Sequence, residues 1–68
     1  MIVFTKLFIK LKEKGITQYA LINKYGISPA QITRFKKNNN VNTNSIDMMC
    51  KILNCRIDEI CEYKKENK

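Results

Sequence analysis

The hydrophobic residues of this chain recur at the three- and four-residue spacing that places them on one face of an amphipathic helix. The first such segment ends at Gly15, because glycine readily adopts the positive φ of a helix C-terminus. The pattern predicts an all-α domain, a compact bundle of five helices. The five segments cover about residues 4–14, 17–25, 28–37, 43–53 and 57–61. The positions expected to face the core are Phe4, Leu7, Phe8, Leu11, Leu21, Ile22, Tyr25, Ile27, Ile32, Phe35, Ile46, Met49, Cys50, Leu53, Ile57, Ile60 and Cys61.

Several residues at the ends of these segments favour the predicted boundaries. Thr17 and Ser28 are favourable N-cap residues, and Pro29 stands at a first helical position, where its missing N–H would have no helical partner. Asn54 is suited to a left-handed helix stop, and Asp58 could cap the short last segment.

The second and third segments are joined by only a few residues, and two helices joined this tightly cross steeply. Ile27 lies in this turn, where an apolar side chain can fill the angle between the helices. Residues 17–37 therefore have the form of a helix-turn-helix unit. We expect it to be part of a single domain that spans residues 1–68.

The first three residues, Met1 to Val3, are apolar and partly β-branched. Such a segment is either a frayed end or a short strand that pairs with the other terminus. The pattern leaves both alternatives open.

The charge of the chain is +7 and its isoelectric point is about 9.5, which favours a polyanionic partner, either nucleic acid or an anionic membrane surface. The whole excess lies in residues 1–37, since residues 38–68 are neutral. We expect no membrane partner, because no run approaches the ~20 apolar residues of a span and the first helix needs its apolar face to cover a small core. RNA is the weaker choice, since no run of exposed aromatic residues is predicted.

The sequence contains no histidine, so a serine or cysteine nucleophile would lack its usual base. The three cysteines, Cys50, Cys55 and Cys61, are spaced unlike a zinc knuckle and are expected to belong to the core. Their odd number, with no signal peptide, favours a reduced, cytoplasmic protein. We therefore expect no enzyme activity, no metal and no cofactor.

This chain resembles the helix-turn-helix of the phage repressor and Cro family, also called the XRE type. The resemblance lies in Thr17-Gln18, Leu21-Ile22, Gly26-Ile27-Ser28 and Ile32-Thr33-Arg34-Phe35. Residues 42–53 resemble the fourth helix of that fold, and residues 53–60 resemble its closing turn and fifth helix. The resemblance covers about residues 4–62. It implies a lambda-repressor-like fold that places the helix 28–37 in the major groove of double-stranded DNA.

Four positions depart from the family pattern. Ile22 stands where the second helix usually has a small residue, and Pro29 and Ala30 stand where glutamine or serine is common. Lys36 replaces a common glutamate, which adds positive charge on the side expected to face DNA.

The third predicted helix offers side chains for both kinds of DNA contact. Arg34 can bind guanine O6 and N7, and Gln31 can pair with adenine N6 and N7. The residues expected to face bases are Pro29, Ala30, Gln31, Thr33 and Arg34. The residues expected to contact phosphates, some of them at positively polarised helix starts, are Thr17, Gln18, Ser28, Lys36, Lys37, Asn38, Asn40 and Asn42.

These residues predict a sequence-specific transcriptional regulator, a repressor that binds two half-sites as a homodimer and has no small-molecule ligand domain. The sequence does not decide which surface forms the dimer. The candidates are the exposed apolar residues Ile2, Ile9 and Met48, the C-terminal segment with Cys61 and Tyr63, and a strand edge formed by the termini. The alternative is a small protein-interaction module, antitoxin-like or anti-repressor-like, with the same helical fold.

Overall fold

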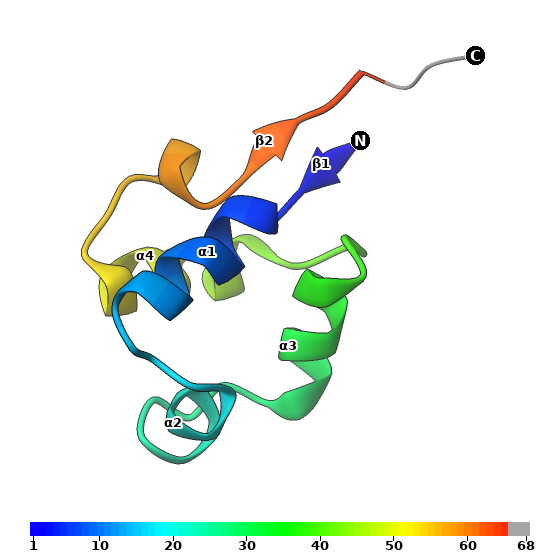
Figure 1. Ribbon diagram of the computed structural model, residues 1–68. Helices are drawn as coiled ribbons and strands as arrows, with labels where there is room; N and C mark the ends of the chain where they lie inside the picture. Colours follow the sequence, from blue (N-terminus) through cyan, green and yellow to red (C-terminus); the bar gives the residue numbers. More distant parts are fainter. Residues whose placement is uncertain (66–68) are drawn as a thin grey trace.

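The computed structural model describes residues 1–65 and has four α-helices in this part of the chain, not five. The elements are β1 (Ile2–Val3), α1 (Thr5–Glu13), α2 (Gln18–Asn23), α3 (Pro29–Lys36), α4 (Thr43–Leu53), the 3₁₀ turn η1 (Ile57–Glu59) and β2 (Glu62–Tyr63) (Figure 1). The predicted fifth helix is only the turn η1.

Asp58 does not cap this turn, contrary to the prediction. The backbone N–H of Arg56 donates to Glu59 Oε2 at 2.7 Å, while the Asp58 carboxylate lies 3.3 Å from Arg56 Nε. The pKa of Glu59 is lowered, mainly by the hydrogen bond from the backbone of Arg56 and next by the hydrogen bond from the side chain of Lys10. The acid that stabilises the start of η1 is therefore at the end of the turn rather than in its middle.

Thr17, Ser28 and Asn54 are confirmed as boundary residues, and Pro29 stands at the first position of α3 as predicted. Thr17 Oγ1 accepts a hydrogen bond from the backbone N–H of Ala20 at 3.1 Å, and Ser28 Oγ accepts one from Gln31 N–H at 3.2 Å. Asn54 has the left-handed φ of 51°. Each cap satisfies a backbone group that the helix end leaves without a partner.

The core is formed by apolar residues from all four helices. Its largest members include Phe35, whose ring meets that of Phe4 edge-on at a centroid distance of 4.8 Å. Most predicted core positions are buried or half-buried against this cluster. Ile57 is the exception at 55% exposure, because the single turn η1 places only the following Ile60 in the core.

The two ends of the described chain form a short antiparallel ribbon, so the strand alternative is confirmed. Ile2 lies opposite Tyr63 and Val3 opposite Glu62. In Figure 1 the ribbon stands at one end of the molecule, with β1 between β2 and the end of α3. The first and last elements are thereby held side by side.

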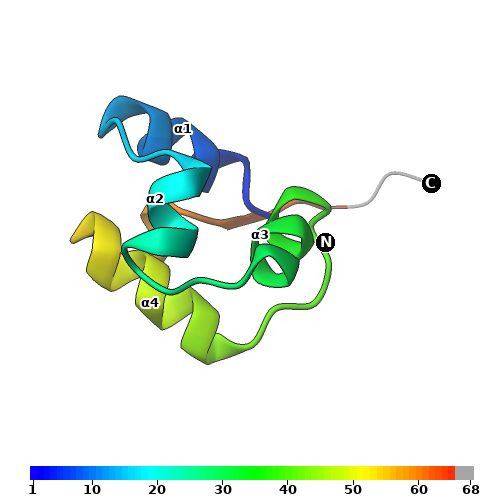
Figure 2. The same cartoon turned by 90° about the horizontal axis from the view of Figure 1, so that it is seen from below.

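The two helices of the predicted helix-turn-helix are steeply inclined to each other. In Figure 1 α2 is seen almost end-on while α3 runs across the view, and in Figure 2 this relation is reversed. The turn between them contains Gly26 with φ 73° and buries Ile27. Because Ile27 fills the angle, α3 is held away from α2 with one side turned to solvent.

Candidate nucleic-acid interface

The rotation of α3 about its axis is fixed by two buried residues three positions apart. Ile32 and Phe35 are almost completely buried, and they anchor α3 on the core. The opposite side of the helix consequently faces solvent. Of the predicted base-contacting residues, it exposes Pro29, Ala30, Thr33 and Arg34, while Gln31 is half-buried.

Arg34 is exposed and, among residues 1–65, forms none of the ion pairs. Those pairs join Lys6 to Glu62, Lys10 to Glu59, Lys51 to Asp47 and Arg56 to Asp58. The Arg34 guanidinium group can therefore offer its planar set of donors outward, without first breaking a bond to a carboxylate.

Gln31 is held by the neighbouring helix. The Ser45 hydroxyl donates to Gln31 Oε1 at 2.8 Å, and this bond links α3 to the first turn of α4. Pairing with adenine uses both the oxygen and the nitrogen of a glutamine amide. A two-bond contact from Gln31 would thus require the Ser45 bond to open, whereas a single donated bond from the amide nitrogen would not.

Thr33 also has an internal partner. Its hydroxyl donates to the carbonyl oxygen of Pro29 at 3.1 Å, one turn earlier in α3. The hydroxyl proton is thereby engaged within the helix. Its methyl group remains suited to the contact with a thymine methyl group that the sequence predicts.

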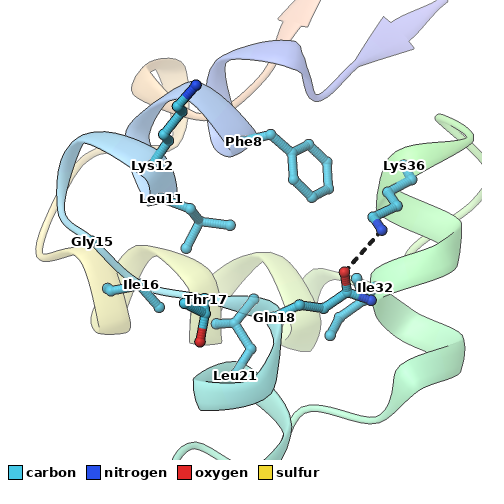
Figure 3. A pocket seen from close by; sticks show the side chains of 10 residues that line it. All are labelled: Phe8, Leu11, Lys12, Gly15, Ile16, Thr17, Gln18, Leu21, Ile32 and Lys36. Carbon is cyan, nitrogen blue, oxygen red and sulfur yellow. Dashed lines mark hydrogen bonds between the residues drawn. The ribbon is translucent and has the colours of Figure 1, made fainter.

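Seven of the eight predicted phosphate-contacting residues fall into three groups. Thr17, Ser28 and Asn42 are the N-caps of α2, α3 and α4. Lys36 Nζ donates to Gln18 Oε1 at 2.9 Å, which joins α3 to the start of α2 (Figure 3). Lys37 and Asn40 are exposed beyond the end of α3.

Asn38 has a structural role that the sequence did not reveal. It has a left-handed φ of 54°, and its Oδ1 accepts a hydrogen bond from the backbone N–H of Phe4 at 2.9 Å. The side chain thus ties the end of α3 to the start of α1, 34 positions earlier. No local pattern in the sequence signals such a contact.

The ion pairs leave the helix-turn-helix without a neutralising acid. Acids of the C-terminal segment pair with α1, since Glu59 lies 3.3 Å from Lys10 and Glu62 lies 3.9 Å from Lys6. Residues 17–37 contain no acid and four basic residues, namely Lys24, Arg34, Lys36 and Lys37. The four basic residues of the helix-turn-helix are therefore among those that form no ion pair within residues 1–65, as are Lys12, Lys14, Lys64 and Lys65 outside it.

A hollow of about 320 Å³ lies between α1, α2 and α3, behind the bond from Lys36 to Gln18 (Figure 3). Its lining is mostly apolar, from side chains such as Phe8 and Ile16, and it includes no carboxylate, imidazole or thiol. The hollow thus lies between α1 and the Gln18–Lys36 bond, and its lining offers no carboxylate or imidazole that could act as a general base.

The three cysteines are free thiols that pack, half-buried, against the core. Burial raises the pKa of Cys50 and of Cys61, which favours the protonated thiol. Within residues 1–65, no three potential metal ligands gather in one group, and no helix is long and apolar enough to cross a membrane.

Comparison with known proteins agrees with this geometry. The family model of the Cro/C1-type HTH DNA-binding domain matches residues 6–66. The crystal structure of the transcriptional regulator VanUg, form II, is similar with a TM-score of 0.84 and 26% sequence identity, over 96% of this chain and 87% of that one. None of the curated proteins matches the chain. The fold, the exposed side of α3 and the family match together establish that this chain belongs to the Cro/C1-type helix-turn-helix DNA-binding domains.

Proposed function

We propose that this protein is a transcriptional repressor of the cytoplasm that binds a two-fold operator as a homodimer and reads it with α3. The observation that carries the proposal is the exposed side of α3, where Arg34 is free of carboxylate partners within residues 1–65. The likeness to VanUg, a transcriptional regulator, supports a role in regulation.

In this proposal α3 lies in the major groove, where each base pair presents a distinct pattern of donors and acceptors. Arg34 binds guanine O6 and N7, and the small side chains at the start of α3 allow close approach to bases. These are Pro29 and Ala30, with Thr33 one turn later. Gln31 donates one hydrogen bond from its amide nitrogen while its oxygen keeps the Ser45 bond.

Contacts with phosphates hold α3 in register without reading sequence. Lys36 and Lys37 supply charge, and the backbone N–H groups at the start of α3 face the same strand. The remaining residues proposed to lie along the phosphates are Thr17, Gln18, Ser28, Asn38, Asn40 and Asn42. For Asn38 the free group is the amide nitrogen, because its oxygen is bonded to Phe4 N–H.

One α3 helix covers only a few base pairs, so a homodimer would read two half-sites about 34 Å apart. Selection from random duplex DNA at about 0.15 M salt tests this directly, since specific binding exceeds non-specific binding by roughly 10³ or more under such conditions. We expect a short sequence with two-fold symmetry to be enriched. No enrichment, with weak binding that disappears as salt rises, would contradict the proposal and favour the protein-interaction module.

Replacing Lys37 by alanine should weaken binding to every DNA sequence and leave the order of preference unchanged. A lysine that contacts a phosphate displaces one counterion, so the slope of log K against log salt should fall by about 1. Titrations at several salt concentrations measure this slope. The matched control is Lys51→Ala, because Lys51 is an exposed lysine of α4 that pairs with Asp47. Equal slopes for Lys37→Ala and the unchanged protein would remove Lys37 from the interface.

A further inference from the structure

Ser45 lies in the first turn of α4 and bonds to Gln31 of α3. Its hydroxyl oxygen is 2.8 Å from Gln31 Oε1 and 3.1 Å from Asn42 Oδ1. A serine hydroxyl has one proton to donate, so it can donate to only one of these oxygens. Asn42 Oδ1 already accepts the backbone N–H of Ser45 at 2.8 Å, and the distance to Gln31 is the shorter one. The hydroxyl proton therefore belongs to the bond with Gln31.

This bond decides which end of the Gln31 amide is free. The oxygen accepts from Ser45, whereas the amide nitrogen forms no hydrogen bond within residues 1–65. Gln31 is half-buried, yet no buried side-chain nitrogen or oxygen in the described part of the chain lacks a partner. The amide nitrogen is therefore in contact with solvent, and it has two N–H groups to offer.

Gln31 lies one turn before Arg34 on α3. Residues three positions apart are neighbours on the surface of a helix, so the two side chains belong to the same side. Arg34 is exposed there, while Gln31 also reaches α4 through the Ser45 bond. Gln31 thus stands at the border between α4 and the side of α3 that is proposed to read DNA.

We propose that Ser45 determines which base Gln31 reads, as a positioning residue that touches no base itself. Held by Ser45, the Gln31 amide presents donors only and selects a base that presents acceptors. In the major groove guanine presents two acceptors, N7 and O6, and thymine presents one. Adenine presents an acceptor beside a donor, and cytosine presents a donor. Gln31 is therefore assigned to guanine instead of the adenine that a free glutamine pairs with.

This inference rests on the proposed function, since it takes α3 to lie in the major groove. Selection from random duplex DNA with the unchanged protein and its variants tests it. Gln31→Ala identifies the base pair that Gln31 reads, because the preference at that pair alone should disappear. The unchanged protein should select guanine at this pair. Ser45→Ala releases the amide oxygen for a two-bond contact, so the ratio of adenine to guanine should rise about tenfold.

The variants at position 45 leave the start of α4 intact. Asn42 Oδ1 bonds to the backbone N–H of residue 45, which alanine retains, and alanine is the most favourable helix former. Ser45→Thr keeps a hydroxyl and should keep the preference for guanine. The matched control is Asn44→Ala, which removes a polar side chain from the neighbouring exposed position of α4 and should not change the preference.

The double variant Q31A/S45A shows whether Ser45 acts through Gln31. It should select the same bases as Gln31→Ala alone, because the amide that Ser45 positions has been removed. A purely structural role of Ser45 would instead lower the affinity for all sequences by a similar factor. It would not exchange one preferred base for another at a single pair.

The outcomes separate this inference from the proposed function. The inference is overturned if the unchanged protein selects a base other than guanine at the Gln31 pair, or if Gln31→Ala selects an unchanged sequence. It is also overturned if Ser45→Ala leaves the ratio of adenine to guanine unchanged. In each case an enriched operator still supports the proposed function. If the unchanged protein enriches no sequence at all, the proposed function fails and the inference fails with it.

Discussion

Arg34→Ala is expected to weaken binding to the selected operator by about 1–3 kcal/mol per half-site, which is roughly 5- to 150-fold. The guanidinium group is exposed on α3 and has no carboxylate partner among residues 1–65, so its bonds to a guanine would not replace an internal ion pair. Binding should also become less selective at one base pair of each half-site. Competition titrations against operators substituted at every position measure both effects.

The matched control is Arg56→Ala, which removes the same charge at the start of η1 instead of on α3. Arg56 is an exposed arginine at the start of η1 and pairs with Asp58 at 3.3 Å. It should change affinity little and selectivity not at all. If Arg34→Ala weakens all sequences equally, then Arg34 contacts a phosphate and the assignment of a base contact is wrong.

Phe35→Ala is expected to destabilise the fold by about 3–5 kcal/mol, the usual loss when a buried phenylalanine is truncated. Phe35 is completely buried, and its ring packs edge-on against Phe4. A domain of this size has only about 3–10 kcal/mol of stability in total. Most molecules of the variant should therefore be unfolded or close to it at 37 °C. Thermal and urea denaturation followed by circular dichroism measure the change.

Phe8→Ala provides the comparison within the same helix bundle. Phe8 is half-buried and lines the hollow between α1 and α3, so less apolar area is lost and less stability with it. We expect Phe8→Ala to keep a cooperative transition at a lower midpoint. Equal midpoints for Phe35→Ala and the unchanged protein would show that Phe35 does not anchor α3.

Local sequence signals predicted the helices because the groups that define a helix end are only a few residues apart. Thr17 and Ser28 bond to backbone N–H groups three positions later, and an isolated sequence shows both partners. The last segment was predicted as a helix because its apolar spacing allows one. The structure has a single turn there, since the chain must leave it at once to place Ile60 in the core and form β2.

The roles of Gln31 and Asn38 could not be predicted from the sequence. Their side-chain oxygens bond to Ser45 and to Phe4, 14 and 34 positions away. Only the packing of α3 against α4 and α1 creates these contacts. Both residues were predicted to contact DNA, and each retains only an amide nitrogen for that purpose unless its internal bond opens. The exposure of Arg34 could be predicted, because it follows from the spacing of Ile32 and Phe35.

The ribbon of the two termini has a consequence for how the molecule folds and opens. The helices form from neighbouring residues, but the Met1–Lys64 bond joins residues 63 positions apart, so the entropy of closing the whole chain must be lost before it forms. The ribbon should therefore form last during folding and open first in the native state. Amide hydrogen exchange should accordingly be faster at Lys64 than at Leu53.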